Sequence, residues 1–250
     1  MKMNLLLSND DGIYSPGLQK LAKKLKSSFN LQVIAPNYDR SGSSHALTIN
    51  QPLRIHRFSN GDITVISGTP ADCVYLGVNF FMQPKPDFVI SGINLGSNLG
   101  DDVFYSGTIA AAFEGRDLKY SSFAISLTGK RYLCTAIKIT CKLLNAIAKN
   151  PLKKKYILNI NIPDLPLKKI KGFKVTKLGR HYTKHKIIQK KDPKNNKIFW
   201  IGANLKNYED RSDTDFYAIK HGYISVTPLS LNLTYHEAID PIFKWFEMYT

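Results

Sequence analysis

The stretch that decides the fold is Leu5-Leu6-Leu7-Ser8-Asn9-Asp10-Asp11-Gly12. Its apolar run predicts a buried parallel strand, and open α/β sheets bind ligands just beyond the carboxyl ends of such strands. Two adjacent carboxylates repel each other when they lose hydration, so they favour a cation that neutralises both. The octet therefore suggests a divalent metal site at Asp10 and Asp11, although Asp11-Gly12 is also typical of an ordinary turn.

Strand and helix patterns alternate through the first half of the chain. Short apolar runs predict further strands at 32–35, 63–66, 88–91 and 123–126. Ser15-Pro16-Gly17 predicts one helix start, with Ser15 as the cap, and Thr69-Pro70-Ala71-Asp72 predicts a second with a capping box. Small residues predict a third helix over 108–119. The alternation indicates an α/β fold, in which helices cover a mainly parallel sheet.

The pattern changes after Pro151. Residues 157–162 alternate apolar residues with Asn, and residues 167–207 are basic. The later segments predict a hairpin around 187–201 with a turn at 192–196, a strand at 222–228, and an amphipathic helix over 235–249. We therefore expect a catalytic core over 1–166 and a C-terminal extension over 167–250, whose late strand rejoins the core. Because lone hairpins are marginal in water, the extension favours burial against a second subunit.

Four loops that follow predicted strands are rich in oxygen-bearing side chains. They are Ser8–Gly12, Ala35–His45, Ser67–Pro70 and Ser91–Asp102. Loops that follow parallel strands lie at one edge of a sheet, so carboxylate, hydroxyl and amide oxygens converge there. Ligation by oxygen alone suits magnesium, manganese or calcium better than a soft metal.

A possible phosphate site follows the fourth loop. The sequence Tyr105-Ser106-Gly107-Thr108 leads into an alanine-rich helix, so hydroxyls and free backbone N–H groups lie at a helix start. Ser106, Gly107 and Thr108 are therefore candidate phosphate ligands, to which we add Asn98 from the fourth loop. Plain helix capping by Ser106 or Thr108 is the competing interpretation.

The composition is that of an ordinary globular protein with an excess of positive charge. Lys and Arg number 35 against 19 Asp and Glu, which gives a formal net charge of +16 and favours anionic partners. A noncatalytic, basic nucleic-acid-binding protein is thus the alternative hypothesis, but it leaves the oxygen-rich loops unexplained. The three cysteines show no close metal-ligand spacing, and no apolar stretch approaches the length of a membrane span. We expect a cytoplasmic enzyme.

The combined motifs resemble those of the SurE family of 5'-nucleotidases, which are metal-dependent phosphatases. The matching segments are Asn9–Gly12, Ala35-Pro36, Arg40–Gly42, Ser67–Cys73, Ser91–Asn94, Tyr105–Thr108, Glu114-Gly115, Leu158–Pro163 and Gly222–Leu229. They run along nearly the whole chain, and their combination is far more specific than any one of them. Ser8, where threonine is common in the family, and a short segment after Ser126 depart from the pattern.

The resemblance implies a Rossmann-like three-layer core, with a C-terminal extension exchanged between the subunits of a homodimer or homotetramer. It implies one divalent cation, Mg²⁺ or Mn²⁺, held by Asp10, Asp11, Ser41 and Asn94. It also implies hydrolysis of nucleoside 5'-monophosphates, with 3'-nucleotides and short polyphosphate as further substrates. Asp10 and Asp11 are then the catalytic carboxylates, and either direct attack by one of them or deprotonation of water is compatible with these residues.

Other polar residues allow more than one interpretation. His45 could protonate a leaving oxygen or bind the substrate, or it could be a loop histidine bonded to the backbone. His181 and His185 have a spacing of four residues but lack the glutamate of a helical zinc motif. The cluster of Asp210, Asp213 and Asp215 around Arg211 is predicted to form a surface or interface network.

Overall fold

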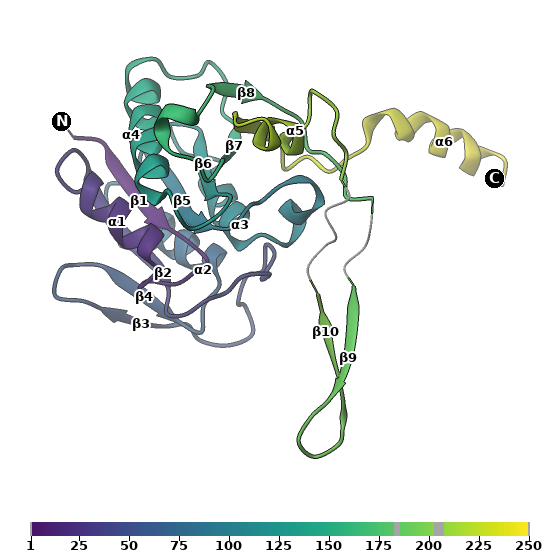
Figure 1. The fold of residues 1–250 in the computed structure, drawn as a ribbon, viewed down its shortest axis with the longest axis horizontal. Coiled ribbons are helices and arrows are strands. Elements are labelled where there is room, and N and C mark those ends of the chain that lie inside the picture. The colour runs from purple at the N-terminus through teal and green to yellow at the C-terminus, as the bar shows by residue number, and fades with distance from the viewer. Residues whose placement is uncertain (1, 183–185, 203–207, 250) are drawn as a thin grey trace.

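A mostly parallel sheet forms the centre of the molecule (Figure 1). The computed structural model describes residues 2–182, 186–202 and 208–249, which hold a nine-stranded sheet in the order β3-β4-β2-β1-β5-β6-β7-β11-β8. The strands are β1 Asn4–Ser8, β2 Asn30–Pro36, β3 Arg54–Arg57, β4 Ile63–Ile66, β5 Phe88–Leu95, β6 Ser122–Leu127, β7 Ile157–Ile162, β8 Phe173–Val175 and β11 Ile224–Leu229. Neighbours from β4 to β7 pair in parallel, whereas β3 and β11 run antiparallel to β4 and β7. The predicted α/β fold is confirmed.

Helices cover both faces of this sheet, so the core has three layers. The helices are α1 Pro16–Leu25, α2 Pro70–Leu76, α3 Gly107–Phe113, α4 Leu133–Lys149, α5 Asp215–Lys220 and α6 Ile239–Glu247. Short helical turns are η1 Gly77–Phe81, η2 Gly100–Tyr105, η3 Leu167–Lys169 and η4 His236–Ala238. Helices α1 and α4 contact each other over one face, and α2 and α3 contact each other over the opposite face.

The first two helix starts have the predicted caps. The hydroxyl of Ser15 accepts a hydrogen bond from the backbone N–H of Leu18 at 3.4 Å. Thr69 and Asp72 form the complete capping box, because each side chain accepts from the backbone N–H of the other, at 3.0 and 2.9 Å. Within α1, Gly17 lies so close to β5 that a Cβ atom there would be 2.0 Å from the carbonyl oxygen of Ile93. These contacts fix α1 and α2 against the strands that carry the oxygen-rich loops.

The third helix is shorter than the prediction over 108–119. Helix α3 ends at Phe113. The chain then turns onto the sheet at Gly115, where a Cβ atom would be 2.3 Å from the hydroxyl oxygen of Ser122. Helix α3 ends before this close approach to the sheet. It is therefore a short helix, and its first turn lies at the edge of the sheet.

The C-terminal segments contribute both to the sheet and to structures outside it. Strands β11 and β8 lie in the central sheet, while β9 Ile187–Lys191 and β10 Lys197–Ile201 form the predicted antiparallel hairpin. Figure 1 shows the hairpin and α6 projecting from the core in different directions. The boundary at residue 166 stays a prediction. None of the helices in the described ranges is long and apolar enough to span a membrane.

Candidate active site

Asp10 and Asp11 lie directly after β1, at the carboxyl edge of the parallel sheet. Asp10 is buried, and its Oδ1 atom accepts a hydrogen bond of 2.5 Å from the hydroxyl of Thr108 in α3. Asp11 is half-buried and borders a cavity of about 430 Å³. Its Oδ2 atom accepts a weak bond of 3.4 Å from the backbone N–H of Leu95 at the end of β5. The two carboxylates therefore face different neighbours from one strand end.

The loop after β2 lies against this strand end. The backbone N–H of Arg40 donates to the carbonyl oxygen of Asp10 at 2.8 Å, which places Ser41 beside the aspartates. The hydroxyl of Ser41 donates to Asp39 at 2.6 Å, so its oxygen lone pairs remain for a ligand. The loop after β5 supplies Asn94, whose amide nitrogen donates to the carbonyl of Gly96 at 2.9 Å. That bond leaves Oδ1 as the atom of Asn94 that is available to a cation. The structure thus brings all four predicted metal ligands to one edge.

The start of α3 completes the same edge. Ser106 caps the helix, because its hydroxyl oxygen accepts from the N–H of Ile109 at 3.1 Å. A Cβ atom on Gly107 would be 2.8 Å from the Cβ of Asp10 and 2.9 Å from the hydroxyl oxygen of Ser43, so only glycine fits here. Thr108 neither caps the helix nor points freely at a ligand, because its hydroxyl bonds to Asp10. Capping by Ser106 is therefore confirmed, the bond from Thr108 to Asp10 was not predicted, and phosphate contacts of both residues stay a prediction.

The electrostatics of the edge favour a cation. Burial raises the pKa of Asp10, against the opposing effect of the hydrogen bond from Thr108. Burial, followed by the neighbouring charge of Asp10, raises the pKa of Asp11 to about 6. Asp39 raises both pKa values further through its negative charge. Sequence reasoning did not single out Asp39, which gives no signal apart from its place in the loop. Excess negative charge at these carboxylates is what a bound cation would relieve.

The residues present fit a hard divalent cation. Asp10, Asp11, Ser41 and Asn94 offer carboxylate, hydroxyl and amide oxygens, the donors that Mg²⁺ and Mn²⁺ prefer. The described residues contain no group of three or more His, Cys, Asp or Glu side chains that could hold a metal. The proposed site agrees with that finding, because only two of its four ligands are carboxylates and the other two are neutral oxygens. The hydroxyl of Ser43, which lies against Gly107, is buried with no hydrogen-bond partner among the described residues.

Comparison with known proteins decides the family. A family model described as "Survival protein SurE" matches residues 5–185. This chain belongs to the SurE family. A protein named 5'/3'-nucleotidase SurE from Wigglesworthia glossinidia brevipalpis is 66% identical over 245 residues, which are 98% of each chain. A protein of the same name from Salmonella arizonae is 51% identical over 98% of this chain and 97% of its own. The SurE resemblance inferred from the motifs is confirmed.

A solved SurE structure supports the fold. The crystal structure of the SurE protein from Aquifex aeolicus matches with a TM-score of 0.85 and 39% sequence identity. The match covers 97% of this chain and 99% of the other. The predicted Rossmann-like, mainly parallel core is therefore confirmed for this SurE-family chain.

Two further predicted site residues of this SurE-family chain have structural partners. The Nε2 atom of His45 lies 2.5 Å from Oε1 of Glu114, and the His45 ring stacks on Phe113 at 5.9 Å. His45 and Ser106 both border a second cavity of about 570 Å³. Asn98 is buried, and its amide nitrogen donates to Ser126 at 2.7 Å. The structure therefore gives both residues structural bonds, and their substrate contacts stay a prediction.

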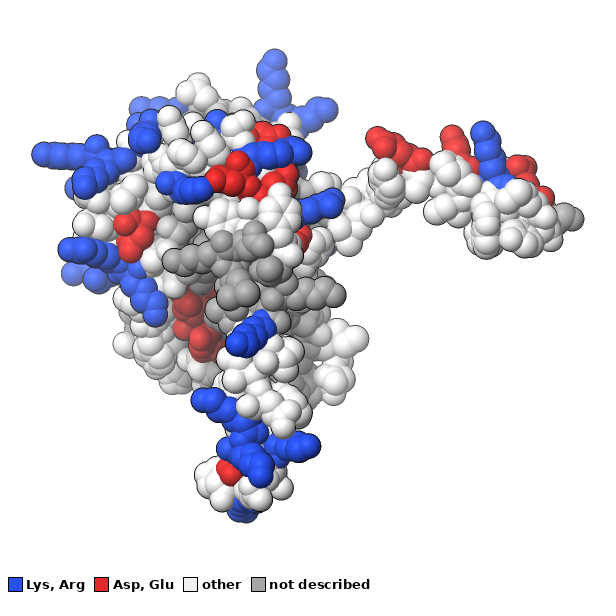
Figure 2. All heavy atoms as spheres, turned by 45° about the vertical axis from the view of Figure 1, so that its right-hand side comes forward, with Lys and Arg blue, Asp and Glu red and all other residues white. Residues whose placement is uncertain are grey.

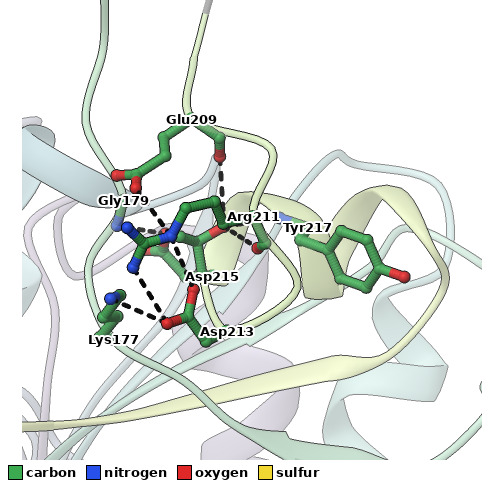
Figure 3. A network of polar contacts seen from close by, with 8 residues as sticks. Lys177, Gly179, Glu209, Arg211, Asp213, Asp215 and Tyr217 are labelled. Carbon is green, nitrogen blue, oxygen red and sulfur yellow. Dashed lines mark hydrogen bonds and ion pairs between the residues drawn. The ribbon is translucent and has the colours of Figure 1, made fainter.

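The acidic cluster near the C-terminus is only partly a surface network (Figure 3). Asp213 is exposed and pairs with Lys177 at 2.8 Å and Arg211 at 3.1 Å, as predicted. Asp215 contradicts the prediction, because it is fully buried and accepts from the backbone N–H groups of Gly100, Gly179 and Phe216 at 2.8, 2.9 and 2.9 Å. The carboxylate thereby ties the C-terminal segment to the η2 loop that leads into α3.

Of the two histidines with a spacing of four residues, only His181 lies in the described part of the chain. His181 lies 3.3 Å from Oδ2 of Asp102, so it adds a second contact between the C-terminal segment and the η2 loop. His185 lies outside the described residues.

Proposed function

We propose that this chain hydrolyses nucleoside 5'-monophosphates to nucleoside and inorganic phosphate, with one divalent cation per subunit. 3'-Nucleotides and short polyphosphate are further substrates in this proposal. Two relatives that match nearly end to end carry the name 5'/3'-nucleotidase SurE. The observation that carries the proposal is the pair Asp10 and Asp11 after β1, with the loops of Ser41 and Asn94 bonded beside them.

Asp10, Asp11, Ser41 and Asn94 would hold the cation, and their oxygens favour Mg²⁺ or Mn²⁺. When bound, such a cation polarises a phosphoryl oxygen and favours deprotonation of water. The chain itself must keep both carboxylates ionised and in place. Thr108 contributes to this because its hydroxyl donates to Asp10 and stabilises the negative charge of the carboxylate.

Ser106 and Gly107 support phosphate binding in this proposal. The hydroxyl oxygen of Ser106 accepts from Ile109, so its own proton remains to donate to a phosphoryl oxygen. Gly107 lies against Asp10, and we propose that its backbone N–H donates to a phosphoryl oxygen. His45 borders the cavity that also contains Ser106, and we propose that it contacts the phosphate of the substrate. Asn98 is a further proposed phosphate ligand, and its amide nitrogen donates to the hydroxyl of Ser126 on β6.

Phosphate release from a substrate panel tests the function. Purified protein, stripped with EDTA and reloaded with single cations, is expected to release phosphate from AMP and 3'-AMP with Mn²⁺ or Mg²⁺. Activity should be lost in EDTA and return when the metal is restored, because the proposed reaction needs the cation that the four oxygen ligands would hold. No release with any cation would reject the proposal. Tight binding of an RNA oligonucleotide without any hydrolysis would favour the noncatalytic alternative instead.

We also propose that the protein is a cytoplasmic homodimer or homotetramer. The thiols of Cys73, Cys134 and Cys141 are all free, which suits a reducing compartment. Helix α6 buries none of its residues in the single chain. Its exposed apolar residues are Ile239, Ile242, Phe243, Trp245 and Phe246, each at least half exposed. Figure 2 shows basic residues at the end of the hairpin and mainly acidic residues along the tail, so the two projections carry opposite charges. An exposed apolar patch such as the one on α6 is typical of an interface.

Removal of the tail tests the assembly. Deletion of residues from Tyr235 onward is expected to convert the oligomer to monomers or to aggregates, because α6 would lose its place in the interface. Light scattering coupled to size-exclusion chromatography at micromolar concentration gives the mass. A full-length protein that is monomeric, or a truncated protein that keeps the full-length stoichiometry, would contradict the proposal.

A further inference from the structure

The cavity beside Asp11 has the size and the walls of a small-molecule site. Its volume of about 430 Å³ lies within the range of about 300–1,000 Å³ that ligand pockets occupy. Asp11 and Gly12 form one border of it, next to the proposed cation. Tyr14, Tyr38 and Lys130 form other parts of the wall. The proposed mechanism uses none of these last three residues.

The two tyrosine rings are held in place although they are exposed. Tyr14 is 74% exposed, and its ring packs edge-on against Phe58 at 6.0 Å. Tyr38 is 49% exposed, and its hydroxyl accepts a bond of 2.7 Å from Arg40, whose guanidinium lies 4.3 Å from the ring centroid. Two ordered aromatic rings at the border of one cavity offer stacking surfaces to a flat ligand.

The backbone around the cavity is also held in place. Gly12 has φ +93°, and a Cβ atom there would be 3.0 Å from the carbonyl carbon of Tyr38, so the Tyr38 backbone packs directly against the aspartate loop. Across the cavity, the N–H of Lys130 donates to Asp164 at 3.1 Å. Among the described residues of the cavity wall, Lys130 is the only basic one, and it supplies a positive charge for an anionic ligand.

We propose that this cavity holds the nucleoside of the substrate, with the base against Tyr14 and Tyr38 and the phosphate near Lys130 and the cation. This inference rests on the proposed function, and it names the part of the site that recognises the base. Stacking accepts every base because each has a π-face, so the chain is expected to hydrolyse purine and pyrimidine nucleotides alike. The larger cavity is a poorer candidate, because neither Asp10 nor Asp11 borders it and its wall includes Leu231 and Leu233, which lead to α6.

The test compares a substrate that has a base with one that lacks it. The kcat/KM ratio of AMP to ribose 5-phosphate is expected to fall about 10-fold in Tyr14→Ala and in Tyr38→Ala, because only AMP loses the stacking contact. Tyr14→Phe and Tyr38→Phe keep the ring and should restore the ratio. Tyr75→Ala is the matched control, since Tyr75 is also 49% exposed but borders a different cavity. Lys130→Gln should raise KM for both substrates alike, because both carry the phosphate.

The possible outcomes separate this inference from the function on which it rests. A ratio that stays unchanged in both alanine variants, or equal losses for AMP and ribose 5-phosphate, would overturn the nucleoside site and leave the phosphatase function standing. A wild-type protein that hydrolyses no phosphomonoester with any cation would reject the function alone. In that case calorimetric titration with adenosine decides the cavity: binding that the alanine variants lose and the phenylalanine variants keep supports it, and no such difference overturns it.

Discussion

Asp11→Asn is expected to lower kcat/KM for AMP by at least about 100-fold at saturating Mn²⁺, while the fold stays intact. The substitution keeps the shape of the side chain and removes one of the two negative charges that would hold the cation. In the proposed mechanism it also removes a group that would either attack phosphorus or accept the proton of water. Phosphate release measures the loss, and circular dichroism measures the fold. Turnover within about threefold of the wild type would contradict a catalytic role for Asp11.

The same substitution should stabilise the protein when metal is absent. The pKa of Asp11 is raised to about 6, above its unfolded value, so the ionised form weakens the fold. That loss is fully present above pH 6 and disappears as the pH falls toward the unfolded pKa near about 4. In EDTA at pH 7.5 we expect a gain on the order of 1 kcal/mol, after allowance for solvent access, and none near pH 4. Asp117→Asn makes the same charge change at a carboxylate whose side chain is 90% exposed, and it should change neither activity nor stability.

Asp215→Ala is expected to lower the free energy of unfolding by about 3 kcal/mol. The reason is that Gly100, Gly179 and Phe216 would keep buried backbone N–H groups with no acceptor. Asp215→Asn should lose less, because one side-chain oxygen still accepts while the new amide nitrogen faces a donor. Urea unfolding monitored by circular dichroism gives the free energies.

Asp213→Ala is the matched control for this prediction. Asp213 lies two residues away, but it is exposed and pairs with Lys177 and Arg211 at the surface, so the expected loss is below about 1 kcal/mol. If Asp213→Ala and Asp215→Ala lost the same free energy, the three backbone hydrogen bonds would not be what stabilises this segment. A KM for AMP that rises in Asp215→Asn would further indicate that the η2 loop has moved.

The elements predicted correctly from sequence are those whose signals are local. Ser15 before Pro16 and the pair Thr69 and Asp72 lie within one turn of the helices that they cap, so the sequence alone reveals them. Helix α4 was not predicted, although its apolar residues have helical spacing. Its first turn has no side-chain cap of its own, because the Asp164 carboxylate accepts from Tyr132 at 2.7 Å across 32 residues. Strand β3 was also missed, since all four of its residues are exposed at the edge of the sheet.

In the candidate site, too, the features with local sequence signals were predicted and those that depend on distant contacts were not. The types of Asp10, Asp11, Ser41 and Asn94 and their places after strands were enough to predict that they meet at one edge. The role of Thr108 was not predictable, because its bond to Asp10 joins residues 98 positions apart. Asp215 was placed at the surface because acidic residues near an arginine usually lie there. Its actual partners are backbone N–H groups of Gly100 and Gly179. Every residue type except proline has such a group, so the sequence does not show which of them lie near Asp215.

The absence of a side chain at Gly17 allows helix α1 to pack directly on the strand that carries Asn94. Helix α1 lies in direct backbone contact with Ile93, the residue before Asn94, and the loop of Asp10 and Asp11 leads into the same helix. The loop of the two aspartates and the loop of Asn94 are therefore held next to each other without a bound ion. The Ser41 loop is more exposed, and its backbone bonds to Asp10 through the N–H of Arg40 and to Tyr105 through the N–H of Ser44. In the proposed site, Asp10, Asp11 and Asn94 would be ligands on tightly packed segments, and Ser41 would be the ligand on an exposed loop.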